Sequence, residues 1–316
     1  MTNEIIQTKN NYIINPIYIN WNDPNLLIQV IEQIRKGSSI VPRIEIQTLR
    51  NMLQQIYHNP KSYFILQCGP CAESLKDNTK QYVHKLLNLI INMTDIISND
   101  QKEIIIITRL AGQYAKSRSH EFEKINNKVI PTYKGDMINS INPDLLSRTP
   151  NPRRILEAYY NSQNTIQFIK EFNKTNHYCI FTSHEALVTE YENALKRTSH
   201  NNDVFITSAH FLWVGTRSTK INSPQIQILQ HITNPIGIKI SHTINIKELI
   251  QIIKFLNPLN EEGKICLIPR LGLSHIHEKL APIIECVLEN NYPVLWLCDP
   301  MHGNTHKIFD RKYYKK

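Results

Sequence analysis

The residues Glu103–Thr108 read EIIIIT, and Arg109 follows them directly. Four consecutive isoleucines without polar alternation are typical of a strand that is covered on both faces, as in a parallel sheet. Six more short apolar runs are separated by longer amphipathic segments: Tyr63–Gln67 (YFILQ), His177–Thr182 (HYCIFT), Asp203–Thr207 (DVFIT), Ile236–Ile240 (IGIKI), Lys264–Ile268 (KICLI) and Pro293–Leu297 (PVLWL). The sequence therefore predicts an α/β fold with seven parallel strands.

Each of these runs is followed by polar or charged residues. In a (β/α) barrel the carboxyl ends of all strands meet at one rim, and reactive groups gather there. The residues that would reach this rim are, in strand order, Cys71 and Glu73, Arg109, His184 and Glu185, Trp213 and Arg217, Lys239, Arg270, and Asp299 with His302. This distribution favours a (β/α)8 (TIM) barrel over a doubly wound sheet, with the eighth strand missing after the seventh run.

Helices are predicted between the runs and before them. Asn78–Ile97 and Arg153–Phe172 have helical length and pattern, and Trp21–Met52 predicts two helices upstream of the first strand. The second upstream helix is amphipathic, with one face formed by Ile44, Ile46, Leu49 and Leu53. We therefore expect residues 1–60 to form an N-terminal extension with helices that cap the bottom of the barrel or mediate assembly, and residues 61–316 to form the incomplete barrel.

Six cations would surround the mouth of this barrel: Arg109, Lys116, Arg118, Arg217, Lys239 and Arg270. Guanidinium forks and an ammonium group suit phosphate and carboxylate ligands, and several together suit two phosphorylated substrates. Lys116 and Arg118 fall in a loop and have a second interpretation as solvated surface charges. Lys239 and Arg270 end apolar strands, where an unpaired cation is costly to bury.

Cys71 and His302 are candidate metal ligands. A thiolate and an imidazole together suit Zn, Mn, Co or Fe rather than Mg or Ca. Cys71 has two other interpretations, as a small buried side chain or, with Cys68, as a C-x-x-C redox pair. His184 and Glu185 either orient substrate or fix their loop, and the sequence leaves both roles open.

Composition narrows the class of ligand. The chain has 36 Lys and Arg against 27 Asp and Glu, a formal charge of +9. Because the basic residues are scattered, we expect small anionic ligands and no nucleic acid.

The sequence also predicts a cytoplasmic location. No apolar run is long enough to span a membrane, and the N-terminus lacks the pattern of a secretory signal. The six irregularly spaced cysteines indicate reduced thiols.

Seven segments, in this order, resemble the type II 3-deoxy-D-arabino-heptulosonate 7-phosphate (DAHP) synthases: Leu66–Ser74 (LQCGPCAES), Arg109–Ser119 (RLAGQYAKSRS), Gly135–Asn139 (GDMIN), Thr182–Ala186 (TSHEA), Ala209–Arg217 (AHFLWVGTR), Asn234–Lys239 (NPIGIK) and Cys298–Thr305 (CDPMHGNT). The resemblance covers the chain from about Trp21 to Thr305. It implies a (β/α)8 barrel that condenses phosphoenolpyruvate with erythrose 4-phosphate and water, giving DAHP and phosphate in the first step of the shikimate pathway.

The resemblance also implies roles for individual residues. Phosphoenolpyruvate would be held by Arg109, Lys239 and Arg270 with the backbone near Thr216 and Arg217. Lys116, Arg118 and Ser119 would lie on the erythrose 4-phosphate side, and Trp213, Asp299, His184 and Glu185 would support the site. Cys71 and His302 match two of the family's four ligands for a divalent metal (Mn, Co, Zn or Fe). A homo-oligomer is expected.

Three departures from the family pattern qualify this interpretation. Pro70 and Cys68 stand where the family has Asp and Gly, and Thr216 stands where it has Glu. The family's remaining two metal ligands belong to the eighth strand and the loop after it, which we expect to be missing. The alternative is therefore a non-catalytic truncated homologue or partner subunit that keeps the anion-binding site, and a third hypothesis is a pyruvate-binding or aldolase-like enzyme with a changed substrate.

Overall fold

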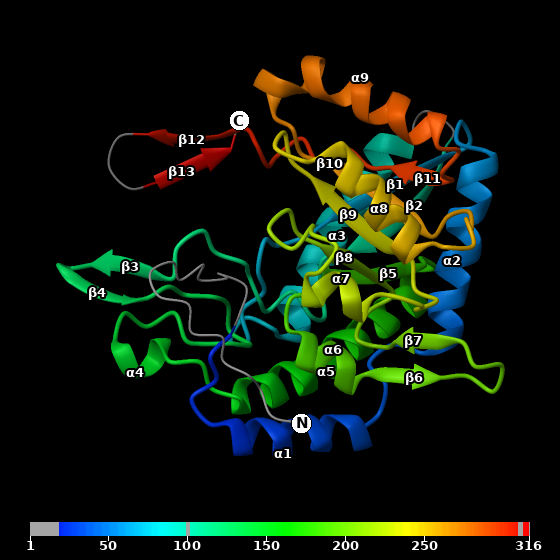
Figure 1. Cartoon of the computed structure of the whole chain (residues 1–316). Helices are drawn as coiled ribbons and strands as arrows, with labels where there is room; N and C mark the ends of the chain where they lie inside the picture. The colour runs from blue at the N-terminus through cyan, green and yellow to red at the C-terminus, as the bar shows by residue number, and fades with distance from the viewer. Residues whose placement is uncertain (1–18, 99–101, 309–311, 316) are drawn as a thin grey trace.

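Seven parallel strands form one curled sheet in the computed structural model, which describes residues 19–98, 102–308 and 312–315 (Figure 1). The spatial order is β1-β2-β5-β8-β9-β10-β11. The bounds are β1 Tyr63–Cys68, β2 Glu103–Thr108, β5 Ile180–Glu185, β8 Phe211–Val214, β9 Ile236–Ile240, β10 Ile265–Pro269 and β11 Val294–Trp296. This order and the covering helices confirm the predicted (β/α)-barrel class, with seven strands among the described residues.

Each strand of this sheet is apolar on two faces, as the runs without alternation predicted. On β2, Ile105 and Ile107 point into the barrel, whereas Ile104 and Ile106 pack beneath the outer helices. The same parity places Lys239 of β9 on the inner side, because its neighbours Ile238 and Ile240 belong to the outer core. Strand parity therefore decides which charged side chains enter the barrel.

Helices cover the outer face of the sheet (Figure 1). The main ones are α3 (Lys80–Ile97), α5 (Arg153–Asn176), α8 (Ile246–Leu256) and α9 (Leu273–Glu289), with shorter α6 (Thr189–Ala194) and α7 (Pro224–Ile228). Thr79 and Asn245 cap α3 and α8 by accepting hydrogen bonds from backbone N–H groups of the first turn. No described helix is both long enough and apolar enough to cross a membrane.

The two upstream helices have different positions. Helix α2 (Arg43–His58) sends Leu49, Leu53 and Ile56 into the core formed by the inward strand residues, and Arg50 reaches Thr233 and Glu261 just before β9 and β10. It therefore caps the bottom of the barrel. The prediction that Ile44 shares the buried face of α2 is wrong, because its side chain is 72% exposed.

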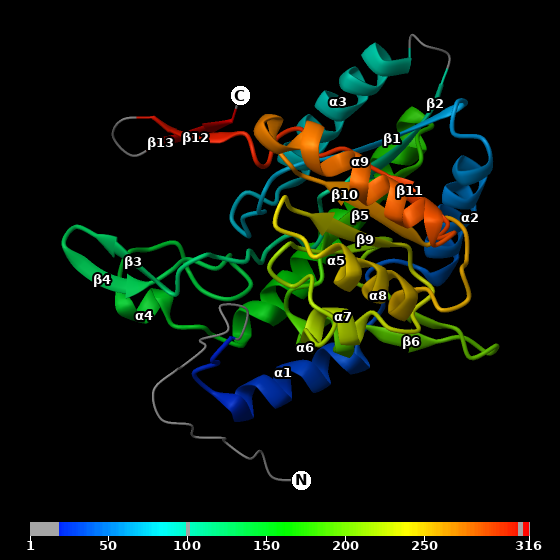
Figure 2. The same cartoon turned by 45° about the horizontal axis from the view of Figure 1, so that its top comes forward.

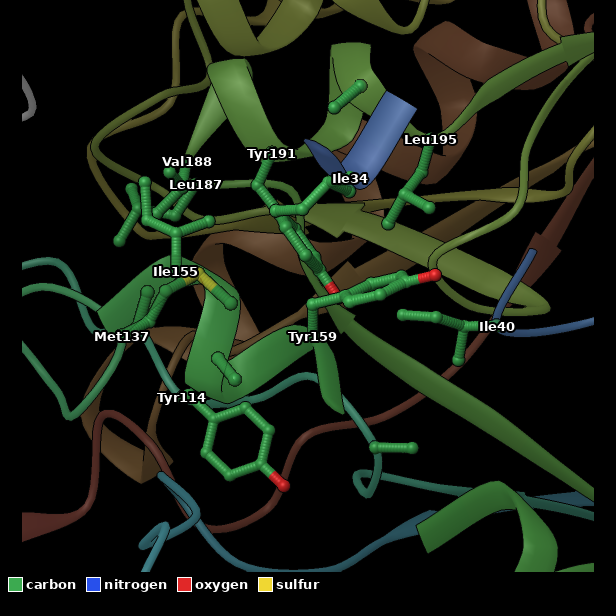
Figure 3. Packing of buried hydrophobic residues seen from close by; sticks show 14 of the residues in the cluster. Ile34, Ile40, Tyr114, Met137, Ile155, Tyr159, Leu187, Val188, Tyr191 and Leu195 are labelled. Carbon is green, nitrogen blue, oxygen red and sulfur yellow. The ribbon is translucent and has the colours of Figure 1, made fainter. Parts of the chain in front are cut away.

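Helix α1 (Pro24–Lys36) packs outside the barrel against α5 and α6. Figure 3 shows Ile34 of α1 beside Tyr159 of α5 and Tyr191 of α6, within one buried cluster. Both upstream helices thus share hydrophobic cores with the barrel.

The fourth strand of the sheet was predicted in the wrong place. Within Asp203–Thr207, Val204–Ile206 (β7) pairs antiparallel with Lys196–Thr198 (β6), and the sheet position belongs to β8. The turn that joins β6 and β7 contains Asn202 in the left-handed region at φ 64°, which is typical of a hairpin. All four residues of β8 are buried, so its sequence satisfies a two-sided sheet position better.

The third strand also begins later than predicted. His177, the first residue of the predicted run, adopts a left-handed φ of 57° and ends α5, so the strand starts at Ile180 and extends to Glu185. The residues beyond the predicted end at Thr182 include His184 and Glu185, which stand at the carboxyl end of β5.

Two hairpins and a short helix extend from the barrel. Strands β3 (Phe122–Ile125) and β4 (Lys128–Pro131) precede α4 (Leu145–Arg148), and β12 (Thr305–Ile308) pairs with β13 (Lys312–Lys315). The views in Figures 1 and 2 agree that these elements project to the same side of the molecule.

The sheet is open between its first and last strands. Within the described residues β1 pairs only with β2, and β11 only with β10. A cavity of about 860 Å³ borders both edges and is lined there by Phe64, Ile65, Leu295, Trp296 and Leu297. The described part of the chain holds no strand in this slot, as the sequence predicted.

Candidate active site

A second cavity, of about 490 Å³, lies at the carboxyl ends of the strands. It is lined by twelve of the fourteen residues that the sequence singled out for the site: Cys71, Arg109, Lys116, Arg118, Ser119, Glu185, Trp213, Thr216, Arg217, Lys239, Arg270 and His302. Residues that are more than two hundred positions apart in the chain thus meet in one place, as expected of the catalytic end of a barrel.

The Trp213 ring lies close to two of the cations. The Arg109 guanidinium lies 5.0 Å from the ring centroid, and the Lys239 ammonium lies 5.2 Å from it. Gly237, two residues before Lys239, is closely packed on this face, since a Cβ there would lie 2.8 Å from Phe211 Cε1 and 2.9 Å from the Trp213 Cβ. Burial lowers the pKa of Lys239 to about 8, with Arg109 as the next contributor. The cavity floor is therefore a strongly cationic surface.

Glu185 is a buried carboxylate among these cations. Burial raises its pKa, and Lys239 and Arg109 oppose the rise. Its Oε1 has no hydrogen-bond partner among the described residues, and a Cβ at Gly215 would lie 2.2 Å from that atom. Gln113 accepts a hydrogen bond from the Glu185 backbone N–H at 3.0 Å, which fixes the end of β5. Glu185 is thus positioned as a group that can hold a proton beside Lys239.

The loop after β2 and the loop after β8 contact each other across the cavity. Arg217 donates hydrogen bonds to the hydroxyl groups of Ser117 and Ser119. Arg118 lies 3.9 Å from the Glu123 carboxylate on β3. Lys116, Arg118 and Ser119 thus lie on one loop that lines the cavity, and Arg217 is bonded to this loop.

Asp299 lies just outside this cavity and connects two of its residues. Its carboxylate is 3.7 Å from the Lys239 ammonium and 2.8 Å from His302 Nδ1, and it accepts the His302 backbone N–H. Burial raises the pKa of Asp299, but the hydrogen bonds from His302 and the charge of Lys239 outweigh that effect and hold it well below its usual value. Asp299 therefore stays ionised and orients the His302 ring.

The metal prediction is met only in part. Cys71 and His302 line the same cavity, yet the described residues contain no group of three or more His, Cys, Asp and Glu side chains arranged to hold a metal ion. A catalytic metal usually keeps three protein ligands. The described residues thus do not make a complete site for the family's metal.

His184 lies away from the cavity. It is buried, its Nε2 is 2.8 Å from Glu192 Oε1, and the other oxygen of Glu192 accepts the Ser208 hydroxyl. Its position favours the second of the two roles left open by the sequence, that of fixing its loop.

The sequence placed Glu73 at the rim, but Glu73 does not line this cavity, and the sequence did not single out Gln113 or Gly215, which stand inside quoted motifs. Gln113 lies in RLAGQYAKSRS and Gly215 in AHFLWVGTR. Gln113 accepts a hydrogen bond from the Glu185 backbone N–H, and Gly215 leaves space for the Glu185 carboxylate because it has no side chain. Neither produces a charge or periodicity signal in the sequence.

Fold and site together define a barrel enzyme of the kind that binds anionic substrates at the carboxyl ends of its strands. The sequence model of the class-II DAHP synthetase family matches residues 8–179 and 170–315, so the chain belongs to that family. This is an aldol-type transferase family of the shikimate pathway.

Individual proteins agree with this assignment. The chain is 30% identical to the phospho-2-dehydro-3-deoxyheptonate aldolase AroG of Mycolicibacterium smegmatis over 319 residues, which covers 83% of this chain and 68% of the relative. It is 29% identical to a probable phospho-2-dehydro-3-deoxyheptonate aldolase of Pseudomonas fluorescens, covering 90% and 72% of the two chains. A solved phospho-2-dehydro-3-deoxyheptonate aldolase from Francisella tularensis has the same fold, with a TM-score of 0.53 at 13% identity, covering 88% of this chain and 74% of that one.

Proposed function

We propose that this chain condenses phosphoenolpyruvate with erythrose 4-phosphate and water to DAHP and phosphate. The observation that carries the proposal is the single cavity in which Arg109, Lys239 and Arg270 converge. Three cations there suit the phosphate and carboxylate of phosphoenolpyruvate, and the N–H groups near Thr216 and Arg217 add donors. Reduced cysteines, all six of them free, support a cytoplasmic setting.

The part of the cavity lined by the loop after β2 is assigned to erythrose 4-phosphate. Lys116, Arg118 and Ser119 lie there on one loop. Two anions held in one cavity bring the enol carbon and the aldehyde carbon together, which lowers the entropic part of the barrier. Condensation also needs a proton taken from water and one delivered to the aldehyde oxygen. Glu185 and Lys239 are the buried groups with shifted pKa values that we assign to these transfers.

Calorimetry with phosphoenolpyruvate tests the anion site. Removing one charge-assisted contact costs about 1.5–3 kcal/mol, so Arg270→Ala should weaken binding by roughly ten-fold or more. Lys279→Ala is the matched control, since it removes one cation from α9 outside the cavity and should leave affinity unchanged. A folded wild-type sample that binds no phosphoenolpyruvate would refute the assignment.

The described residues do not provide a three-ligand metal site, and this supports a second candidate function. A homologue or partner subunit that binds phosphoenolpyruvate without turning it over would keep the cations and lack a third metal ligand. Phosphate release measured with both substrates and added Mn²⁺ separates the two candidates, because only the synthase releases phosphate in proportion to DAHP formed.

A further inference from the structure

Glu73 is a buried carboxylate that has no part in the proposed reaction. Its side chain is 6% exposed and follows β1 in the segment Cys71–Ser74. It lies outside the residues that line the active-site cavity. A buried carboxylate normally requires compensating partners, and the hydrogen bonds that Glu73 receives from the turn after β2 come from backbone groups.

Three consecutive N–H groups donate to this carboxylate. Ala111 donates to Oε2 at 3.0 Å, and Gly112 and Gln113 donate to Oε1 at 2.9 and 2.7 Å. The Glu73 backbone N–H donates in return to the Gln113 carbonyl oxygen at 2.8 Å. Burial raises the pKa of Glu73, and the three N–H bonds oppose the rise. The arrangement is a backbone anion nest whose anion is a side chain of the protein itself.

The turn that Glu73 holds has an unfavourable backbone conformation. Ala111 has a φ of 64°, in the left-handed region that non-glycine residues seldom adopt. Gly112 is packed so closely that a Cβ would lie 2.2 Å from His184 Nδ1. Such conformations persist only where the surroundings over-determine them. The Glu73 carboxylate supplies that constraint.

This turn connects the two sides of the active-site cavity. Arg109 precedes it at the end of β2, where its N–H donates to the Cys68 carbonyl and its guanidinium to the Cys71 carbonyl. Arg109 is thus held by carbonyl groups of β1 and of the segment that follows it. Lys116 and Arg118 follow the turn, and the Gln113 side chain donates to the Ala115 carbonyl next to Lys116. The loop that bears Lys116 and Arg118 follows the turn directly, whereas Arg109 has anchors outside the turn.

We propose that Glu73 is a positioning residue that sets the loop bearing Lys116, Arg118 and Ser119, and with it the second phosphate subsite. The inference deepens the proposed function and rests on it. Glu73 touches no substrate, and its effect is transmitted through the turn Ala111–Gln113. Lys239 and Arg270, which we assign to phosphoenolpyruvate, stand on β9 and directly after β10, so the turn does not carry them.

Two variants test the proposal. Glu73→Gln keeps the shape but replaces one oxygen with an NH₂ group that cannot accept a hydrogen bond, so at least one N–H of the turn loses its acceptor. Glu261→Gln is the matched control, because Glu261 pairs with Arg50 and Lys264 at the opposite end of the barrel. Both remove one carboxylate from a network of hydrogen bonds, and only the first reaches the turn.

The readout is the ratio of two affinities in metal-stripped protein. Phosphoenolpyruvate is titrated first, and erythrose 4-phosphate is then titrated into the saturated sample. Glu73→Gln should change phosphoenolpyruvate affinity by less than about three-fold and weaken erythrose 4-phosphate by about ten-fold or more, the loss expected for one charge-assisted contact. Amide exchange should rise in residues 111–118 and stay unchanged in α5.

The outcomes are separable. If wild type binds no phosphoenolpyruvate, the proposed function fails. If wild type binds both ligands and Glu73→Gln lowers both affinities equally, or lowers neither, the positioning role is overturned and Glu73 serves stability alone. The positioning role is also overturned if Glu261→Gln weakens erythrose 4-phosphate binding relative to phosphoenolpyruvate binding as much as Glu73→Gln does.

Discussion

Lys239 has an unusual ionisation for a lysine, with a pKa of about 8. The side chain is cationic below that pH and neutral above it, so its contact with an anionic ligand is lost as pH rises. We expect phosphoenolpyruvate affinity to fall by about ten-fold between pH 7 and pH 9, as the protonated fraction falls. Calorimetry at several pH values measures this. In Lys239→Arg, whose guanidinium stays charged, the affinity should be flat across that range. A flat profile in wild type would contradict the assignment.

Cys71 and His302 lead to a prediction about metal affinity. Two protein ligands hold a divalent ion less tightly than the three or more of a usual catalytic site. We expect metal added to the purified protein to be lost on dialysis, and condensation activity to be low. Metal analysis after dialysis measures the remaining content, with Cys179→Ser as a control at an exposed cysteine outside the cavity. One tightly held ion per chain, lost in Cys71→Ser, would show that a further residue such as Asp299 completes the site.

At the scale of single residues, the sequence predicted charged groups better than backbone contacts. Arg109, Lys239 and Arg270 were found because each is a cation that ends an apolar run, which is a signal in residue type and position. Glu73 stood in a quoted motif, but its role depends on three N–H groups that converge only in the folded turn. No pattern of residue types encodes that convergence.

The role of helix α2 in capping the bottom of the barrel can be tested at Leu53. Leu53 is fully buried in the core at the bottom of the barrel, where it packs with inward strand residues. Leu53→Ala should cost about 2–5 kcal/mol of unfolding free energy, because it removes buried methyl groups and leaves a cavity. Ile44→Ala, on the same helix but exposed, should change it by less than about 0.5 kcal/mol. Urea unfolding compares the two, and equal losses would mean that α2 does not cap the barrel.

The errors in element placement have a physical explanation. The run DVFIT and the segment FLWV are both apolar and strand-like, and local sequence does not distinguish them. What separates them is strand pairing: β8 pairs in parallel with β5 and β9, whereas β7 pairs antiparallel with β6. The error at Ile44 is one of helical phase: Ile44 lies two residues, about 200°, from the buried Ile46 and therefore faces away from the core. The order of strands was predictable because alternation with helices fixes it.

The open side of the sheet affects the stability and the association of the whole molecule. Strands β1 and β11 each lack a neighbour on one side within the described residues, and the slot between them is apolar. Phe64 is 40% exposed there and Trp296 is 36% exposed. Each unpaired backbone group that becomes buried costs about 1–3 kcal/mol, against a total stability of roughly 5–15 kcal/mol for a domain. Exposed strand edges of this kind pair readily with other strands.

We therefore expect the chain to fill this slot in one of three ways: by aggregating, by taking a strand from a second copy or a partner, or by using its own segment Tyr12–Ile19 (YIINPIYI), of which residues 12–18 lie outside the described residues. Light scattering over a range of concentrations measures the mass, and amide exchange measures protection of β1 and β11. Phe64→Lys places a charge on the exposed edge and should reduce association, as charged edge residues do in natural sheets. Leu259→Lys adds the same charge at an 80% exposed position remote from the slot and should leave association unchanged. A monomer at all concentrations, with β1 and β11 protected and residues 12–19 exchanging freely, would contradict all three routes.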